Sequence, residues 1–152
     1  MAARQDSAFR KLHDGPEIFI IPNPWDIGTA KFLASLGFKA LATTSAGFAF
    51  SRGLPDGGVD FEAMIAHCRE IVAATGLPVS ADLENGKGDS ADSAAETIFA
   101  AEAAGLAGCS LEDATGDRAK PIYDFDKAVE RVAAAAEAAK ALPRDFVVTA
   151  RC

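Results

Sequence analysis

The sequence predicts an α/β fold with parallel strands, and three observations support this class. Five short apolar segments alternate with four longer segments in which apolar residues recur at helical spacing. The turns that lead from a helix into the next strand are tight and contain glycine, at Gly37, Gly76 and Gly105. The connections that leave the strands are longer and carry the polar residues. Strands joined through helices pair in parallel, so the pattern fits either an open doubly wound sheet or part of an eight-stranded (β/α) barrel.

The boundaries of each element follow from local composition. The predicted strands span residues 18–21, 39–44, 78–84, 107–113 and 146–151. The first of them, the apolar run IFII, is ended by Pro22 and Pro24. The predicted helices span residues 27–36, 61–74, 91–104 and 125–142. Asp26 can cap the first helix, and alanine favours helix in the last two. At 152 residues, the chain has the length of a single domain.

Composition and charge argue against several classes of protein. Asp and Glu outnumber Lys and Arg by 22 to 15, for a net charge of −7, whereas a nucleic-acid-binding protein normally presents a basic face. No apolar run approaches the ~20 residues that span a bilayer, so no membrane partner is expected. The first six residues contain no apolar segment typical of a secretory signal, and the three cysteines form no CxxC pair. We therefore expect a cytoplasmic protein.

Carboxylates stand at the C-terminal ends of the strands predicted at 78–84 and 107–113. Asp82 and Glu84 are two residues apart, so their side chains share one face of a strand. Glu112 holds the corresponding position on the next strand, and Asp56 lies in the loop after the second strand. In both architectures these ends meet at one edge of the sheet. Like charges at close range repel, and a divalent cation that prefers oxygen ligands, Mg²⁺ or Mn²⁺, would relieve the repulsion.

Two further segments at the same edge can bind anions. Thr43, Thr44 and Ser45 end the second strand, and their hydroxyl and backbone N–H groups can hold a carboxylate or a phosphate. Arg151 ends the fifth strand, where its guanidinium can bind a substrate carboxylate through two hydrogen bonds.

Residues 86–91 offer a different interpretation, because they match the GxGxxA pattern of a dinucleotide-binding turn. The chain would then be an open-sheet nucleotide-binding domain. Asp82 and Glu84 stand directly before this turn and would repel a pyrophosphate. The acidic residue expected about twenty positions later falls inside the next helix.

Seven motifs, in chain order, resemble the isocitrate lyase / phosphoenolpyruvate mutase superfamily. They are NPWD at 23–26, TTSAG at 43–47, GLPD at 53–56, ADLENG at 81–86, LEDATG at 111–116, PIYD at 121–124 and TAR at 149–151. The resemblance covers nearly the whole chain and implies one partial (β/α) barrel domain over residues 1–152, truncated after the fifth of eight strands. It also implies a Mg²⁺-dependent lyase or mutase that acts on C–C or C–P bonds of small 2-oxo or 2-hydroxy acids. In that family the reaction passes through an enolate held on the metal.

The resemblance also implies a role for each candidate residue. Acidic side chains form the metal site, with Asp82 as the direct ligand and metal-bound waters held by Asp56, Glu84 and Glu112. Polar side chains bind the carboxylic-acid substrate, namely Thr43, Thr44, Ser45 and Arg151. The loop at 116–121 departs from the family pattern, because it is shorter and contains neither the Cys that serves as acid/base in the lyases nor the His of the same motif. By the resemblance, Arg151 is a candidate catalytic residue, and Lys120 is a second candidate as a loose match to the lysine of the mutase-type loop.

An incomplete barrel leaves the edges of parallel strands exposed, and exposed edges associate. We therefore expect a homo-oligomer, or completion of the barrel by a second piece. The alternative to an enzyme is a truncated, catalytically inactive barrel fragment that only folds and oligomerises.

Overall fold

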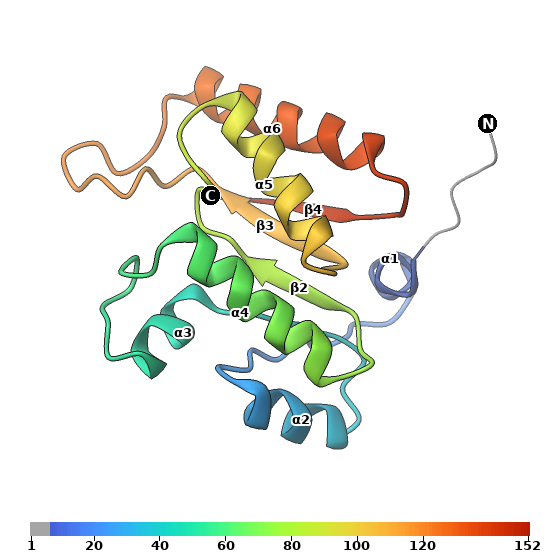
Figure 1. Ribbon diagram of the computed structural model, residues 1–152. Helices are drawn as coiled ribbons and strands as arrows, with labels where there is room; N and C mark the ends of the chain where they lie inside the picture. The colour runs from blue at the N-terminus through green and yellow to red at the C-terminus, as the bar shows by residue number, and fades with distance from the viewer. Residues whose placement is uncertain (1–6) are drawn as a thin grey trace.

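The computed structural model describes residues 7–152 and contains, within them, one four-stranded parallel sheet in the order β1-β2-β3-β4. The strands are β1 (Leu41–Ala42), β2 (Val79–Asp82), β3 (Gly108–Glu112) and β4 (Val147–Arg151). The helices are α1 (Ala8–Asp14), α2 (Ile27–Ser35), α3 (Ser45–Ser51), α4 (Phe61–Ala74), α5 (Ala91–Ala103) and α6 (Phe125–Ala141). Figure 1 shows α4 and α5 lying across one face of the sheet, with α6 beside α5. The residues that bear on a secretory signal, 1–6, lie outside the described part.

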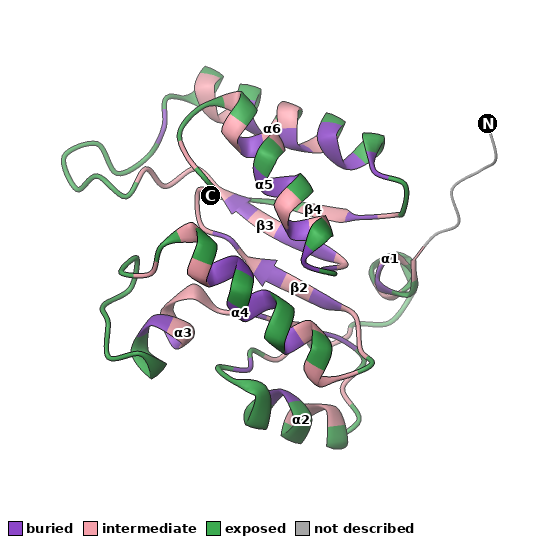
Figure 2. Ribbon diagram, in the orientation of Figure 1, coloured by how far each residue is buried: buried purple, intermediate pink, exposed green. Residues whose placement is uncertain are grey.

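The core forms between this helical layer and the sheet. Along β2, Val79 and Ala81 are buried against the helices, whereas Ser80 and Asp82 alternate with them and face the other side. Figure 2 shows the buried residues of α4 on the side of the helix that faces the sheet. Within residues 7–152, no helix combines the length and the apolar character needed to cross a bilayer.

The expectation of a strand at 18–21 is wrong, so the described chain has four strands where five were expected. The segment approaches β1 near its end, where the Ala42 N–H donates to Pro22 O at 3.1 Å. Pro22 and Pro24 have no N–H to donate to a ladder. The Ile18 side chain is fully exposed, so the apolar character of this run is not used to fill the core.

Several local predictions are confirmed and two helices were missed. Asp26 caps α2 in a capping box with Thr29, and Gly37 adopts the left-handed conformation that ends this helix (φ 89°). The helices α1 and α3, both of seven residues, fall where no helix was expected. Each begins at a hydroxyl N-cap, Ser7 and Thr44 respectively, which is the signal that could have revealed them.

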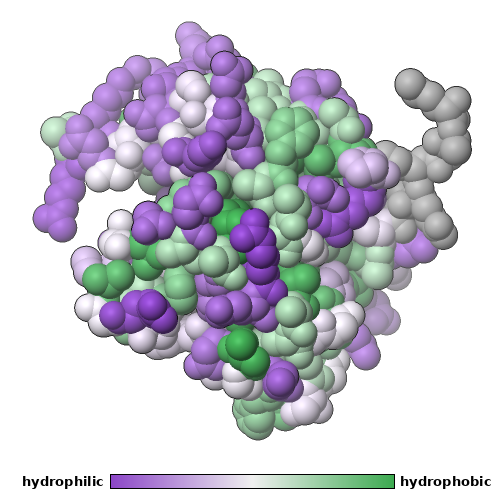
Figure 3. All heavy atoms as spheres, viewed as in Figure 1, coloured by the Kyte–Doolittle hydropathy of each residue, from purple (hydrophilic) through white to green (hydrophobic). Residues whose placement is uncertain are grey.

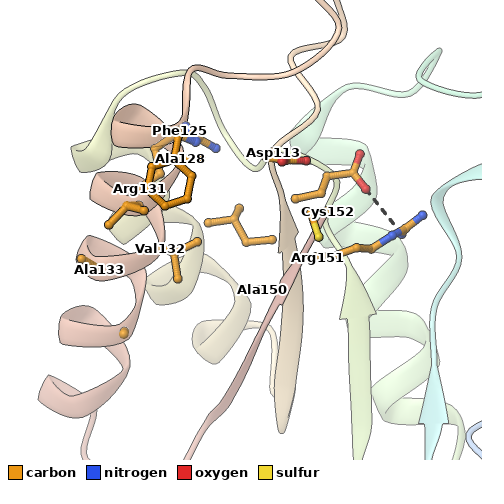
Figure 4. A pocket seen from close by; sticks show the side chains of 13 residues that line it. Asp113, Phe125, Ala128, Arg131, Val132, Ala133, Ala150, Arg151 and Cys152 are labelled. Atoms are coloured by element: carbon orange, nitrogen blue, oxygen red, sulfur yellow. Dashed lines mark ion pairs between the residues drawn. The ribbon is translucent and has the colours of Figure 1, made fainter.

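The groove between β4 and α6 is open and mainly apolar. It forms a cavity of about 620 Å³. Figure 4 shows Phe125, Ala128 and Val132 of α6 on one side of it and Ala150 of β4 on the other. Phe125 is 80% exposed. β4 pairs with β3 along its whole length, while its burial decreases towards its end, as expected for an edge strand.

Candidate functional site

A second cavity, of about 410 Å³, lies at the C-terminal ends of the strands. Six of the residues predicted for the site line it, namely Thr43, Thr44, Ser45, Asp56, Asp82 and Arg151. They come from four separate stretches of chain, which the parallel sheet brings together because all its strands end at the same edge. Phe9 and His13 of α1 also line this cavity.

Asp82, at the end of β2, is held in a defined orientation. Its Oδ2 accepts hydrogen bonds from the hydroxyl of Ser45 at 2.8 Å and from the Ser45 N–H at 3.3 Å. Its Oδ1 accepts from the N–H of Glu84 at 3.3 Å. The backbone N–H of Asp82 donates to the hydroxyl of Thr43 at 3.2 Å. The hydroxyls of Thr43 and Ser45 were predicted to bind the substrate. In this structure both form hydrogen bonds with Asp82.

The hydroxyl of Thr44 has a local partner. As the N-cap of α3, it accepts a hydrogen bond from the N–H of Gly47 at 3.2 Å. Because Thr44 starts the helix on which Ser45 is the first residue, it places Ser45 against Asp82.

The side chain of Arg151 forms ion pairs with two of the carboxylates predicted for the site, those of Asp82 and Glu112. Its Nη1 lies 3.4 Å from Asp82 Oδ1 and 3.5 Å from Glu112 Oε2. β4 pairs with β3 so that Arg151 stands directly beside Glu112. Figure 4 marks an ion pair of Arg151 with a dashed line and shows the Arg151 side chain pointing away from α6. The Arg151 side chain remains more than half exposed, so it is accessible to a ligand.

Burial and neighbouring carboxylates raise the pKa values of Glu84 and Glu112. Burial raises the pKa of Glu84, and the charge of Asp82 raises it further. Burial also raises the pKa of Glu112; Arg151 opposes this, while Asp82 and Asp56 add to it. Negative charge therefore exceeds positive charge at this edge, although no direct contact joins all four acids.

The donor set fits a hydrated magnesium ion better than a closed metal cage. Within residues 7–152, no three His, Cys, Asp or Glu side chains are grouped closely enough to hold a metal directly. Mg²⁺ characteristically keeps several waters and takes one or two carboxylates. Asp82, with two carboxylate oxygens oriented by Ser45 and Glu84, can supply the direct contact, and the neighbouring acids can accept hydrogen bonds from waters.

The structure does not bring Lys120 to this cavity. Its Nζ lies 2.5 Å from Asp124 Oδ2 and it lines a separate, smaller cavity with Tyr123. The loop between β3 and α6 projects from the body of the molecule (Figure 1), and Figure 3 shows that its surface is mostly hydrophilic. Hydrogen bonds inside the loop, such as Thr115 N–H to Pro121 O at 2.9 Å, give it this separate shape. The expected catalytic role of Lys120 has no support in this arrangement.

The buried cysteines do not replace the acid–base cysteine that the loop lacks. Burial raises the pKa of both Cys68 and Cys109 to about 12, so both thiols stay protonated at neutral pH. Cys68 lies 4.0 Å from the hydroxyl of Thr43 and packs in the core.

Three hydroxyl residues of the cavity were missed in the sequence. Ser80, Ser110 and Thr149 each stand two positions before a charged site residue, and all three line the cavity. The signal was the period of two along a strand, which places residues i and i+2 on one face. The pairing register aligns Asp82 with Ser110 and Ser110 with Thr149 across the sheet.

Comparison with known proteins gives matches along nearly the whole chain. A family model described as phosphoenolpyruvate phosphomutase matches residues 9–152. The protein named "Probable 2-methylisocitrate lyase 2" of Corynebacterium glutamicum is 33% identical over 151 residues, which cover 95% of this chain and 48% of that protein.

Solved structures agree with these sequence matches. A crystal structure from Burkholderia cenocepacia J2315 gives a TM-score of 0.94 at 61% identity, over 95% of this chain and 52% of that chain. Phosphonopyruvate hydrolase, crystallised with oxalate and Mg²⁺, gives a TM-score of 0.87 at 25% identity, over 95% and 50% of the two chains. The chain thus spans about half the length of the relatives it matches.

Proposed function

The chain belongs to the phosphoenolpyruvate mutase/isocitrate lyase superfamily, and from this premise we propose that it carries the metal-binding and substrate-binding residues of a lyase or mutase. The substrate class is a small 2-oxo or 2-hydroxy carboxylic acid, and the bond made or broken is C–C or C–P. The observation that carries the proposal is the cavity in which Arg151 lies between Asp82 and Glu112, at 3.4 and 3.5 Å.

The chain's own residues supply binding and charge stabilisation. The exposed guanidinium of Arg151 donates to substrate oxygens, where negative charge builds as the bond breaks. The hydroxyls of Ser80, Ser110 and Thr149 offer further donors along the same wall. Ser45 keeps the Asp82 carboxylate oriented into the cavity. Mg²⁺ or Mn²⁺, when bound, would supply Lewis-acid polarisation of the same substrate oxygens.

Calorimetric titration of Mn²⁺ tests this proposal without an activity assay. The wild-type chain should bind the ion, and Asp82→Asn should bind it at least tenfold more weakly, because the direct ligand loses its charge. Asp92→Asn, which neutralises an exposed carboxylate at the start of α5, is the matched control and should bind as the wild type does. Equal affinity in Asp82→Asn and the wild type would remove Asp82 from the metal site.

The alternative is a barrel fragment that folds and associates without turnover. Two observations favour it, namely the open groove of about 620 Å³ beside β4 and the placement of Lys120 outside the cavity. A screen of 2-oxo and 2-hydroxy acids with Mn²⁺ present distinguishes the two functions. Turnover that disappears in Arg151→Met supports the enzyme; metal binding with no turnover of any acid supports the fragment.

A further inference from the structure

A buried arginine in α6 stands out among the charged residues of that helix. Arg131 is 2% exposed. It shares its buried face with Ala135, Ala138 and Ala139, at helical spacing. A guanidinium among alanines is costly to bury unless its donors find partners. The partners of Arg131 therefore show what its burial holds in place.

Those partners are main-chain oxygens of the loop between β2 and α5. Nη1 donates to Gly88 O at 2.5 Å and to Ser90 O at 3.3 Å, and Nη2 donates to Asn85 O. The guanidinium also lies 4.6 Å from the centre of the Tyr123 ring. No carboxylate within residues 7–152 forms an ion pair with it. Its charge therefore fixes a backbone and does not neutralise an acid.

The Tyr123 side chain extends this network to the loop after β3. Its hydroxyl donates to Asp89 Oδ1 at 2.6 Å and accepts from Asn85 Nδ2 at 3.1 Å. Asn85 Nδ2 also lies 3.4 Å from Thr115 O. Arg131, Tyr123 and Asn85 thus join the two loops that follow β2 and β3.

The loop held in this way begins immediately after Asp82. Glu84 lies at its start in the left-handed conformation (φ 52°), which a residue with a side chain adopts only when its surroundings hold it there. The carbonyl of Glu84 accepts from the N–H of Glu112 at 2.9 Å. Further along, the Lys87 N–H donates to the hydroxyl of Thr97 at 2.9 Å. α5 anchors one side of the loop through Thr97, and α6 anchors the other.

We propose that Arg131 is a positioning residue, which fixes the loop at 84–90 so that Glu84 stays beside Asp82 and Glu112. The part of this inference that concerns metal binding rests on the proposed function. The part that concerns the loop rests on the hydrogen bonds alone.

Two readouts test the inference, namely hydrogen exchange of the loop amides and calorimetric binding of Mn²⁺. Arg131→Met removes the donors and keeps most of the stem. It should speed exchange at the Gly86 and Lys87 amides at least tenfold and weaken Mn²⁺ binding about 10- to 100-fold, as outer-shell substitutions do. Arg131→Lys should fall between this variant and the wild type. Ala138→Gly loosens the same helix without touching the loop, and should change neither readout. Unchanged exchange in Arg131→Met overturns the inference.

Tyr123→Phe covers the case in which Arg131→Met fails to fold. It removes the bonds to Asp89 and Asn85 and leaves the ring beneath the guanidinium. Exchange at the loop amides should rise several-fold, and unchanged exchange in both Tyr123→Phe and Arg131→Lys overturns the inference. If the wild type binds no Mn²⁺, the proposed function fails, and the exchange measurements still decide the role of Arg131.

Discussion

The contact between α1 and the start of β4 fixes one wall of the candidate site, and its strength can be measured. The Arg10 Nε atom lies 2.9 Å from both carboxylate oxygens of Asp145, and the Ser7 hydroxyl donates to the same carboxylate at 2.8 Å. The Asp145 side chain is 8% exposed. These contacts hold α1 so that Phe9 and His13 line the cavity.

The free energy by which this contact stabilises the fold follows from the pKa of Asp145. Burial by itself would raise this pKa, but hydrogen bonds from Arg10 and Ser7 outweigh burial and lower the pKa from 3.8 to about 2. At about 1.4 kcal/mol per pKa unit, the difference corresponds to about 2.5 kcal/mol of stability at pH 7. Because the pKa is lower in the folded state, this stability is present above pH 3.8 and is lost as the pH falls towards 2. About 1 kcal/mol remains at pH 3.

Urea unfolding of Asp145→Asn at pH 7 and at pH 3 checks this reasoning. The variant should lose about 2.5 kcal/mol at pH 7 and about 1 kcal/mol at pH 3 relative to the wild type. Asp14→Asn, at the exposed end of α1, is the control and should change stability by less than about 0.5 kcal/mol. An equal loss at both pH values, or an Asp145 pKa near 3.8 by NMR, would refute the argument.

Three further perturbations have defined outcomes. Gly108→Ala would place a Cβ 2.5 Å from a main-chain oxygen of β4, so urea unfolding should show a loss of about 1–3 kcal/mol; wild-type stability would contradict this. Ser45→Ala removes the 2.8 Å bond to Asp82, and calorimetry should show Mn²⁺ binding about tenfold weaker at unchanged stoichiometry. The open groove predicts self-association at micromolar concentration, which light scattering should detect and which Phe125→Ser with Val129→Ser should weaken; a monomeric wild type would contradict it.

The sequence by itself determined the α/β fold class and indicated most of the charged residues that meet at the candidate site, because both depend on short-range patterns. The period of two along strands places Asp82 and Glu112 on the polar face, and strand–helix alternation requires parallel pairing. Parallel strands end at one edge, so residues as far apart in the chain as Thr43 and Arg151 could be assigned to one candidate site before any coordinates were known. The motif resemblance added the superfamily, which the comparisons confirm.

Tertiary structure alone decided the features that depend on partners far away in the chain. The run at 18–21 has the composition of a strand, but pairing with a neighbour, which composition does not reveal, decides whether a strand forms. Lys120 lies in the loop after β3, whose C-terminal end is at the candidate site. Hydrogen bonds and an ion pair within that loop nevertheless place Lys120 outside the site cavity. In the sequence, Arg131 is one of several charged residues on an alanine-rich helix. It is buried because α6 packs against the loop after β2. Local sequence sets periodicity and capping, whereas burial and long-range hydrogen bonds arise only when separate elements pack together.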